Sequence, residues 1–360
     1  MKLINFEILK NKINFYYRRL DNYLSRNFYL KPNIETIIDD ILEVKINGKP
    51  KTKILYIATK FDYGNKDRGL SYEEHNMFHT LINMPDIEIV RFDFYSIWQK
   101  YGRKYANEMI KEVALLKNVD QIFLILFIDI FDYSIIKNLS NNYSIKTILW
   151  LFDDDKRYLQ TSTLARNVTK VVTTIKHRHI LRIKDGLNSH LSQFGVNHYL
   201  YKDYNMDKVY DVVFVGQKYG DRENYINFIK NQGIQVVAFG EGWSSERVTQ
   251  TQMIEIFNKA KIVLNFSSSE GNLGGDKYIK GRISEVMATG AFLLTEDCEE
   301  LADYFNIGVE LDFFKTREEM IKKIKFYLAN EEKRKMIAHS GKIKVLKECT
   351  YEKLFTKFLY

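Results

Sequence analysis

The stretch "YIKGRISEVMATGAFLLTED" at residues 278–297 joins a helix-length amphipathic segment to a continuous apolar run. A run such as "AFLLTE" at 291–296 is typical of a strand buried on both faces of a parallel sheet. Three basic side chains crowd the start of the helix, where the macrodipole already favours anions: Lys277, Lys280 and Arg282. The stretch therefore predicts a helix–strand unit of an α/β sheet with an anion-attracting helix N-terminus.

Short apolar runs of the same kind recur in both directions along the chain. The first series comprises residues 53–58, 87–92, 121–128, 146–152 and 170–175. The second comprises residues 211–216, 234–240, 261–266 and 291–296. Amphipathic segments of helical length lie between most of these runs, and this alternation is typical of parallel sheets covered by helices. The sequence therefore predicts two α/β domains in tandem.

The segment "YLYKDYNMDKVY" at residues 199–210 has neither a helical nor a strand period, and we interpret it as the linker between the domains. The predicted organisation is a helical basic and aromatic extension at 1–50, a Rossmann-like domain at 51–205, a second Rossmann-like domain at 206–340 and a final helix at 341–360.

Composition narrows the class of protein. A chain of 360 residues with 45% hydrophobic side chains can bury two cores of ordinary size. Its two cysteines, Cys298 and Cys349, lack the spacing of a zinc site or a disulfide framework. The longest apolar run, at 122–128, is stopped by Asp129. We expect no transmembrane segment, no export and a cytoplasmic location.

The basic charge is concentrated at the N-terminus. Residues 1–31 contain seven basic and two acidic side chains with interleaved aromatic ones. Such a segment can lie on an anionic membrane surface or grip a polyanion. Alternatively, its aromatic side chains pack on the following domain and its charges stay in water, which requires no partner.

Ligands of open parallel sheets bind beyond the carboxyl ends of the strands. Gly216 ends one predicted strand and Arg222 opens the next helix, where a phosphate would be favoured; the alternative is a plain turn with a solvated Arg222. After the following strand, Gly240 and Trp243 form a turn through which the backbone could approach a planar base.

The basic helix start of the opening stretch has a similar interpretation. Lys280, Arg282 and the helix N-terminus converge on one spot, whose natural occupant is a diphosphate. Glu285 follows Arg282 by three positions and could accept hydrogen bonds from a ribose diol. The alternative for this pair is a weak surface salt bridge.

Two features of the first domain also suggest a site. Asp153 opens the acidic triplet at 153–155, which either contacts a bound ligand or caps the next helix; a metal-binding role is disfavoured because a complete second α/β series follows. His75 and His79 lie one turn apart without a third ligand, so no metal site is predicted. His75 could exchange a proton with a bound substrate or be a packed or surface histidine.

From about residue 145 onward, seven blocks of the chain stand in the order of a known family: "TILWLFDDD", "YDVVFVGQKYGDR", "VVAFGEGW", "IFNKAKIVLNFS", "IKGRISEVMATGAFLLTED", "FYLANEEKRKMIAHSGKIKVL" and "CTYEKLF". The chain resembles the CgeB-like (spore-maturation-type) branch of the GT-B glycosyltransferases. The resemblance implies two Rossmann-like domains with parallel sheets facing an interdomain cleft. It also implies a nucleotide-diphosphate-sugar donor on the second domain, an acceptor on the first and a final helix that crosses back.

The activity that the resemblance implies is hexosyl or related transfer to an acceptor hydroxyl of a glycan, lipid-linked sugar, protein or other molecule. The expected donor is of UDP type, with no metal and no permanently bound cofactor. The resemblance also implies roles for individual residues. Glu285 corresponds to the glutamate that holds the donor ribose, and Lys280 and Arg282 correspond to the basic pair before it. Gly216 and Arg222 correspond to the loop on the phosphate side.

One departure from the family concerns Lys277, which stands where many retaining members have a second glutamate. Glu270, in an upstream loop displaced by an insertion, would contact the sugar hydroxyls instead. Retention or inversion, the donor base and sugar, the acceptor and the oligomeric state stay open. Two other functions also stay open, a GT-B nucleotide-sugar epimerase and a non-catalytic nucleotide-binding scaffold.

Overall fold

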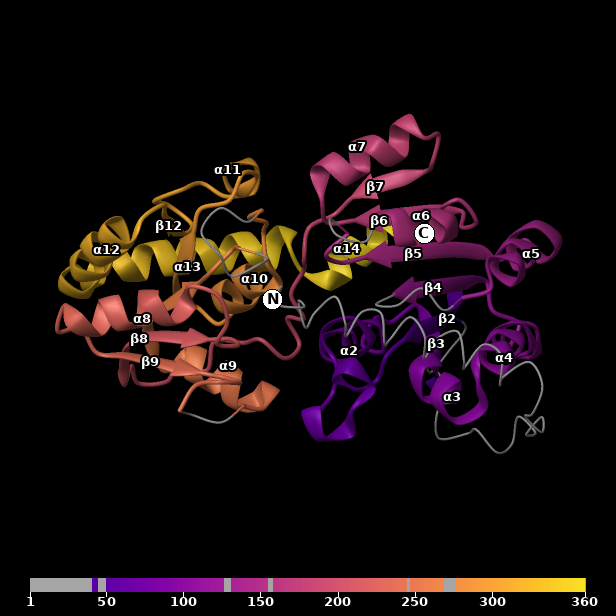
Figure 1. Ribbon diagram of the computed structural model, residues 1–360, viewed down its shortest axis with the longest axis horizontal. Coiled ribbons are helices and arrows are strands. Elements are labelled where there is room, and N and C mark those ends of the chain that lie inside the picture. Colours follow the sequence, from indigo (N-terminus) through magenta and orange to yellow (C-terminus); the bar gives the residue numbers. More distant parts are fainter. Residues whose placement is uncertain are drawn as a thin grey trace, which may run out of the picture. The chain divides into compact units, whose positions relative to one another are not determined.

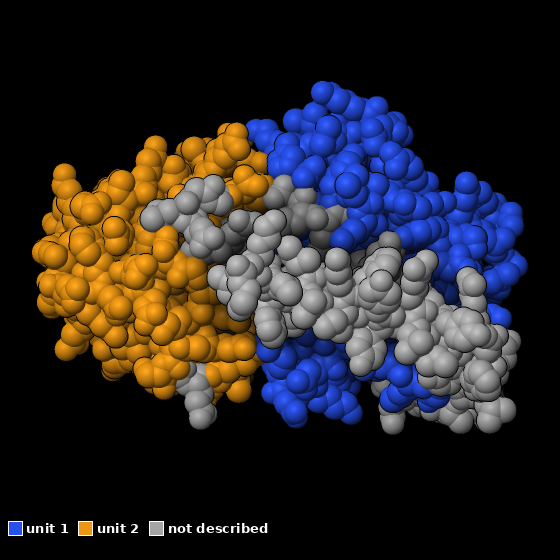
Figure 2. All heavy atoms as spheres, viewed as in Figure 1, with its two compact units in different colours: residues 1–192 blue, residues 193–360 orange. Residues whose placement is uncertain are grey.

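The computed structural model describes residues 41–44, 50–125, 131–154, 158–244, 247–268 and 276–359. The chain divides into two compact units, residues 1–192 (unit 1) and 193–360 (unit 2) (Figures 1 and 2). The sequence put this boundary after residue 205. Residues 193–205 join unit 2 because they bond to it; the Val196 amide, for example, donates to the Cys349 carbonyl over 2.9 Å.

Unit 1 is built on a seven-stranded sheet whose strands lie in the order β1 (Ile41–Val44), β3 (Ile87–Asp93), β2 (Thr52–Ala58), β4 (Gln121–Ile125), β5 (Lys146–Leu151), β6 (Lys170–Thr173) and β7 (Ser189–Leu191). All neighbours pair in parallel except β1 and β3. The helices of unit 1 are a π-helix, η4 (Glu73–Phe78), and α2 (His79–Leu81), α3 (Phe94–Tyr101), α4 (Arg103–Leu116), α5 (Tyr133–Tyr143), α6 (Tyr158–Ala165) and α7 (Lys176–Lys184). Two short 3-10 turns, η2 (Asp62–Gly64) and η3 (Lys66–Arg68), precede η4.

Unit 2 is built on a five-stranded parallel sheet in the order β12 (Asp312–Phe314), β11 (Phe292–Glu296), β10 (Ala260–Asn265), β8 (Tyr210–Val215) and β9 (Val236–Phe239). Its helices are α8 (Arg222–Asn231), α9 (Gln250–Asn258), α10 (Gly281–Ala288), α11 (Leu301–Tyr304), α12 (Arg317–Ala329), α13 (Glu331–Glu348) and α14 (Tyr351–Leu359). Nine strands therefore lie where the apolar runs predicted them, because such runs can be buried on both faces only in a covered parallel sheet.

The sequence did not predict the short strands β1, β7 and β12. Strand β1 also corrects the helical interpretation of 1–50, because residues 41–44 pair antiparallel with β3. This edge strand is held by charge. Lys53 and Lys117 both bond Glu43, at 2.6 and 2.9 Å, and the bond from Lys53 is the main reason why the pKa of Glu43 falls to about 2. Among the described residues, no helix is both long and apolar enough to cross a membrane.

Stability should fall as pH decreases from about 7.5 to about 6, because burial lowers the pKa of four histidines in the folded chain: His75, His179, His190 and His198. The unfolded chain protonates them first, so falling pH favours unfolding. Urea denaturation at the two pH values measures this as a lower midpoint at the lower pH. His179→Gln should reduce the difference, and a midpoint that rises at lower pH would contradict the prediction.

Candidate active site

The carboxyl edge of the unit 2 sheet gathers four of its strand ends. Gly216 follows β8, Gly240 follows β9, Ser267 follows β10 by two positions and Glu296 closes β11. Since the strands are parallel and adjacent, these residues lie along one edge. Helices α8 and α10 begin after the same strand ends, with N-terminal amides that favour an anion.

Three of the predicted residues, Gly216, Gly240 and Trp243, form a tight corner of this edge. The Trp243 indole Nε1 donates to the Gly216 carbonyl over 2.8 Å, and its ring meets the Phe214 ring edge-on at 6.1 Å. Gly240 has φ +124°, and a Cβ there would stand 2.6 Å from the Gly216 oxygen. The corner is therefore held by contacts within unit 2, and base binding by Trp243 stays a prediction.

Gly240→Ala should lower the free energy of unfolding by about 1–3 kcal/mol, because it combines an unfavourable φ with a clash against backbone. Gly233→Ala is the matched control. Its φ is +74°, but nothing lies within 4 Å of the added Cβ, so the loss should be smaller. Urea denaturation of both variants measures the difference, and equal losses would show that the contact with Gly216 is not important.

Arg222 is half-buried at the first position of α8, which excludes the solvated alternative. It donates to the Gln217 carbonyl at 2.9 Å and the Tyr219 hydroxyl at 3.0 Å, and its guanidinium stacks 4.0 Å from the Tyr219 ring. Its Nε is buried and has no hydrogen-bond partner among the described residues. Burial is the main cause that lowers the pKa of Arg222, and the charges of Glu296 and Arg282 also act on it. Arg222 is thus a pre-positioned cation with one unused donor.

Helix α10 begins at Gly281 with Lys280 as its N-cap, and the Lys280 side chain makes no capping bond. Arg282 does not extend from the helix start. It bonds the Met253 sulfur, lies 5.3 Å from the Phe257 ring and pairs with Glu285 at 2.9 Å. Lys280 and the helix N-terminus therefore offer the direct contact to an anion, while Arg282 packs against α9.

Glu285 is 3% exposed, so its pairing with Arg282 is buried and not the surface salt bridge of the alternative. Its other oxygen accepts from the Tyr201 hydroxyl over 2.7 Å, and Gln250 bonds the same hydroxyl. Burial, together with the nearby Glu285 charge, raises the pKa of Tyr201, which keeps the hydroxyl a donor. Each carboxylate oxygen of Glu285 is thus held by a partner from another part of unit 2 or from the preceding turn of α10.

Glu296 is a buried acidic residue at this edge that the sequence analysis missed. One of its oxygens accepts from the Ser267 and Ser268 amides at 2.9 and 3.2 Å, and the other pairs with Lys277 at 2.9 Å. Lys277, the residue that departs from the family pattern, is thus paired with an acidic residue at the end of β11. The sequence carried a signal for Glu296, because this residue is the last of the apolar run "AFLLTE" and ligands of parallel sheets bind at the carboxyl ends of strands.

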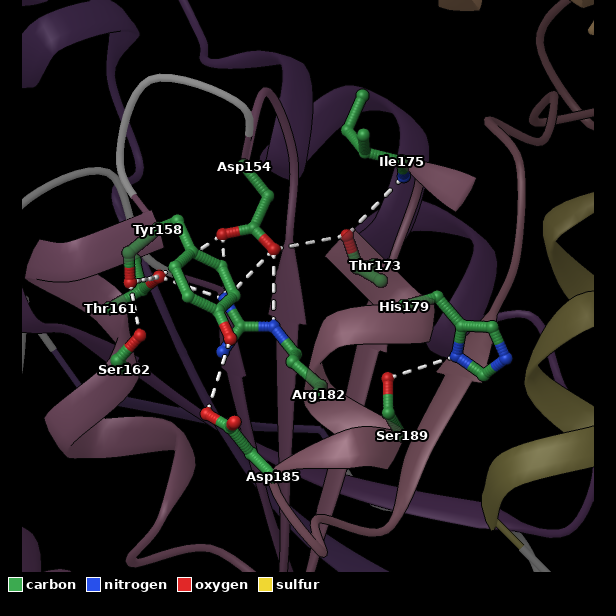
Figure 3. Close-up of polar contacts among 10 residues, drawn as sticks. All are labelled: Asp154, Tyr158, Thr161, Ser162, Thr173, Ile175, His179, Arg182, Asp185 and Ser189. Carbon is green, nitrogen blue, oxygen red and sulfur yellow. Dashed lines mark hydrogen bonds and ion pairs between the residues drawn. The ribbon is translucent and has the colours of Figure 1, made fainter. Parts of the chain in front are cut away.

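In unit 1, the acidic triplet separates into different environments. Asp153 is exposed with φ +48°, an uncommon backbone conformation for a residue other than glycine. Asp154 is fully buried and bonds Arg182 with both carboxylate oxygens, each 2.8 Å from the same Nη2 (Figure 3). Thr161 and Thr173 also donate to Asp154, at 3.0 and 3.1 Å. Asp154 therefore forms a buried ion pair that joins the turn after β5 to α7.

His75 lies half-buried in η4, and burial followed by the charge of His79 lowers its pKa, so it is neutral near pH 7. The start of η4 meets the end of β5, where the Tyr72 and Phe152 rings are 5.6 Å apart. Glu73 is at this junction. Burial is the main cause that raises its pKa, and the charge of Asp153 contributes. The sequence analysis did not identify Glu73.

Two predicted features lie outside the described residues, Glu270 in the gap at 269–275 and the basic segment at 1–31. Within the described ranges, no group of three or more His, Cys, Asp or Glu side chains could hold a metal ion.

Comparison with known proteins agrees with this architecture. A family model described as "Glycosyl transferase-like" matches residues 222–360. No curated protein matches the sequence significantly. The fold is similar to Anabaena HepE in complex with UDP-glucose, with a TM-score of 0.57 and 13% identity over 86% of this chain and 99% of HepE.

Two other solved structures share the fold. For sucrose-phosphate synthase from Thermosynechococcus elongatus the TM-score is 0.59, at 10% identity over 86% of this chain and 98% of the synthase. For a glycosyltransferase from Rickettsia africae it is 0.52, at 12% identity over 86% and 97% of the respective chains. The chain therefore has the GT-B fold of glycosyltransferases, and its residues 222–360 match the glycosyl transferase-like family.

Proposed function

We propose that this protein is a glycosyltransferase of the CgeB-like branch, which moves a hexosyl or related sugar from a nucleotide-diphosphate donor to an acceptor hydroxyl. The observation that carries the proposal is Arg222, a half-buried cation with a buried, unused Nε at the carboxyl edge of the unit 2 sheet. A diphosphate is the anion that suits this cation together with two helix N-termini.

The donor site comprises residues from three connections of unit 2. The Gly216 loop and Arg222 bind one side of the diphosphate, and Lys280 with the first amides of α10 binds the other. Glu285, held by Tyr201 and Arg282, accepts from the ribose hydroxyls. The Gly240 turn with Trp243 lies beside the base. UDP is the first nucleotide to test, because the solved structures of HepE contain UDP-glucose or UDP.

The chemistry follows from these charges. As the bond from sugar to phosphate breaks, negative charge grows on the leaving nucleotide. Arg222, Lys280 and the α10 dipole are already in place and stabilise that charge without reorganisation. The proposed reaction uses no metal ion and no permanently bound cofactor.

The acceptor belongs to unit 1 in this proposal. Asp153 presents its carboxylate at the end of β5, and His75 is a neutral imidazole that can accept the hydroxyl proton. Glu73 lies at the same junction of η4 and β5, and we include it with Asp153 and His75 among the acceptor-side residues. Glu270 would contact the hydroxyls of the transferred sugar.

A thermal-shift screen against UDP, GDP, ADP, CMP and dTDP and their sugars tests the donor site. Bound at a hundred times its dissociation constant, a nucleotide stabilises the folded state by about 2.7 kcal/mol. The shift should persist with a chelator and disappear in Glu285→Ala. No shift with any nucleotide, or a shift that needs a metal, would overturn the proposed site.

Product analysis separates the other functions. Incubation of the shifting nucleotide sugar without acceptor should leave its sugar unchanged. An isomerised sugar would identify an epimerase. If the protein binds the nucleotide sugar but cleaves it with none of the acceptors tested, it is a non-catalytic scaffold.

A further inference from the structure

Helix α7 of unit 1 has the reverse of the usual amphipathic arrangement. Its only buried side chain is that of Arg182, whereas three aliphatic side chains are exposed: Ile180 (45%), Leu181 (38%) and Ile183 (50%). Helices that pack on a sheet normally turn their apolar stripe toward it. Ile180 and Ile183 are three positions apart and lie on the same side of the helix, whereas Leu181 projects from a different side. An exposed apolar pair on such a helix indicates a surface that is covered by something else.

The inner face of α7 is determined by its arginines. Arg182 is committed to the buried pair with Asp154, and the Tyr158 ring lies 4.8 Å from its guanidinium (Figure 3). The same ring lies 4.9 Å from the guanidinium of Arg178. Since Arg178 and Arg182 are one turn apart, they fix which side of the helix faces the sheet. The aliphatic side chains therefore cannot turn inward without leaving a buried carboxylate unpaired.

The outer face combines apolar and cationic groups. Lys176, Ile180 and Lys184 are spaced four residues apart and form one row along the helix, and all three are exposed. His177 is also exposed, and α7 has no acidic residue. Asp185, just beyond its end, is paired with Arg166 at 2.8 Å. Figure 1 shows α7 beside β7. Strand β7 is the edge strand of the sheet opposite β1.

From this face we propose that α7 docks unit 1 onto an anionic lipid surface, with Ile180 and Ile183 inserted among the lipids and Lys176 and Lys184 on the headgroups. Shallow apolar insertion with flanking lysines is how interfacial helices bind membranes. Two lysines in the same row as Ile180 favour an anionic surface over an uncharged protein partner. This contact is separate from the one expected for residues 1–31 and does not depend on glycosyl transfer.

Co-sedimentation of the full chain with vesicles of phosphatidylcholine, with or without phosphatidylglycerol, tests the proposal. The wild-type chain should bind the anionic vesicles more tightly. Ile180→Ser with Ile183→Ser should weaken binding at least about tenfold by removing apolar insertion. Lys176→Gln with Lys184→Gln should weaken it about thirtyfold by removing two charges from the lipid surface.

Matched controls come from unit 2. Ile343→Ser removes an isoleucine that is 53% exposed, and Lys322→Gln removes an exposed lysine; both variants should bind vesicles like the wild type. Because every substituted side chain is exposed, the thermal midpoints of all variants should equal that of the wild type. Equal midpoints would show that weaker vesicle binding is not caused by misfolding. Failure of the wild type to bind anionic vesicles, or α7 variants that bind as tightly as it does, would overturn the proposal. A dimer that Ile180→Ser with Ile183→Ser dissociates in sedimentation velocity would assign the face to a second copy.

Discussion

Asp154→Ala will lower the free energy of unfolding of unit 1 by about 3–5 kcal/mol, because it leaves the fully buried Arg182 guanidinium without its counter-charge. The loss includes the bonds that Thr161 and Thr173 donate to the same carboxylate. Removing the charge therefore affects α6, β6 and α7 together.

The measurement is urea denaturation followed by tryptophan fluorescence in a Trp243→Phe background. Only Trp98 and Trp150 then report, and both belong to unit 1. Asp185→Ala is the control, since it breaks the more exposed pair with Arg166 and should cost less than about 1 kcal/mol.

Replacing both partners distinguishes a missing counter-charge from lost packing. Asp154→Leu combined with Arg182→Met should recover much of the stability, because no charge then remains buried. If Asp154→Ala cost no more than Asp185→Ala, the pair would not hold this part of unit 1.

If the proposed donor site is correct, Arg222→Met will slow the release of the nucleotide from the donor sugar by about 100–1000-fold, because a pre-positioned cation stabilises the leaving diphosphate most strongly in the transition state. Methionine keeps much of the apolar volume against Tyr219 while the charge and donors are lost. The rate is measured with the nucleotide sugar identified by the thermal-shift screen.

Arg317→Met is the matched control. Arg317 also opens a helix of unit 2 and lies 5.4 Å from an aromatic ring, that of Phe228. Its loss should leave the rate within a few-fold of wild type. Equal effects of the two substitutions, or an Arg222→Met rate close to wild type, would remove Arg222 from the donor site.

Much of the carboxyl edge of the unit 2 sheet could be predicted from the sequence. The end of an apolar strand marks the carboxyl edge of a parallel sheet, so Gly216, Arg222 and Gly240 could be placed there without coordinates. Lys280 could be placed at a helix start for the same reason. Each of these inferences uses neighbours within one strand–turn–helix unit, where chain connectivity alone brings residues together.

The partners of the site residues could not be predicted in this way. Tyr201 meets Glu285 across 84 positions of sequence, and Asp154 meets Arg182 across 28. Nothing local distinguishes Asp154 from its exposed neighbour Asp153, because the difference arises from what β6 and α7 place against the turn.

The sequence by itself determined the two α/β units and nine of their strands, because hydrophobic periodicity reports burial along a single element. Tertiary structure decided the short strands β1, β7 and β12, whose few residues carry too little pattern. It also decided that Arg282 packs on α9, that Lys277 pairs with Glu296 and that α7 turns its arginines inward. The physical reason is that buried charges are placed by partners distant in sequence, and those partners meet only when the sheets have formed.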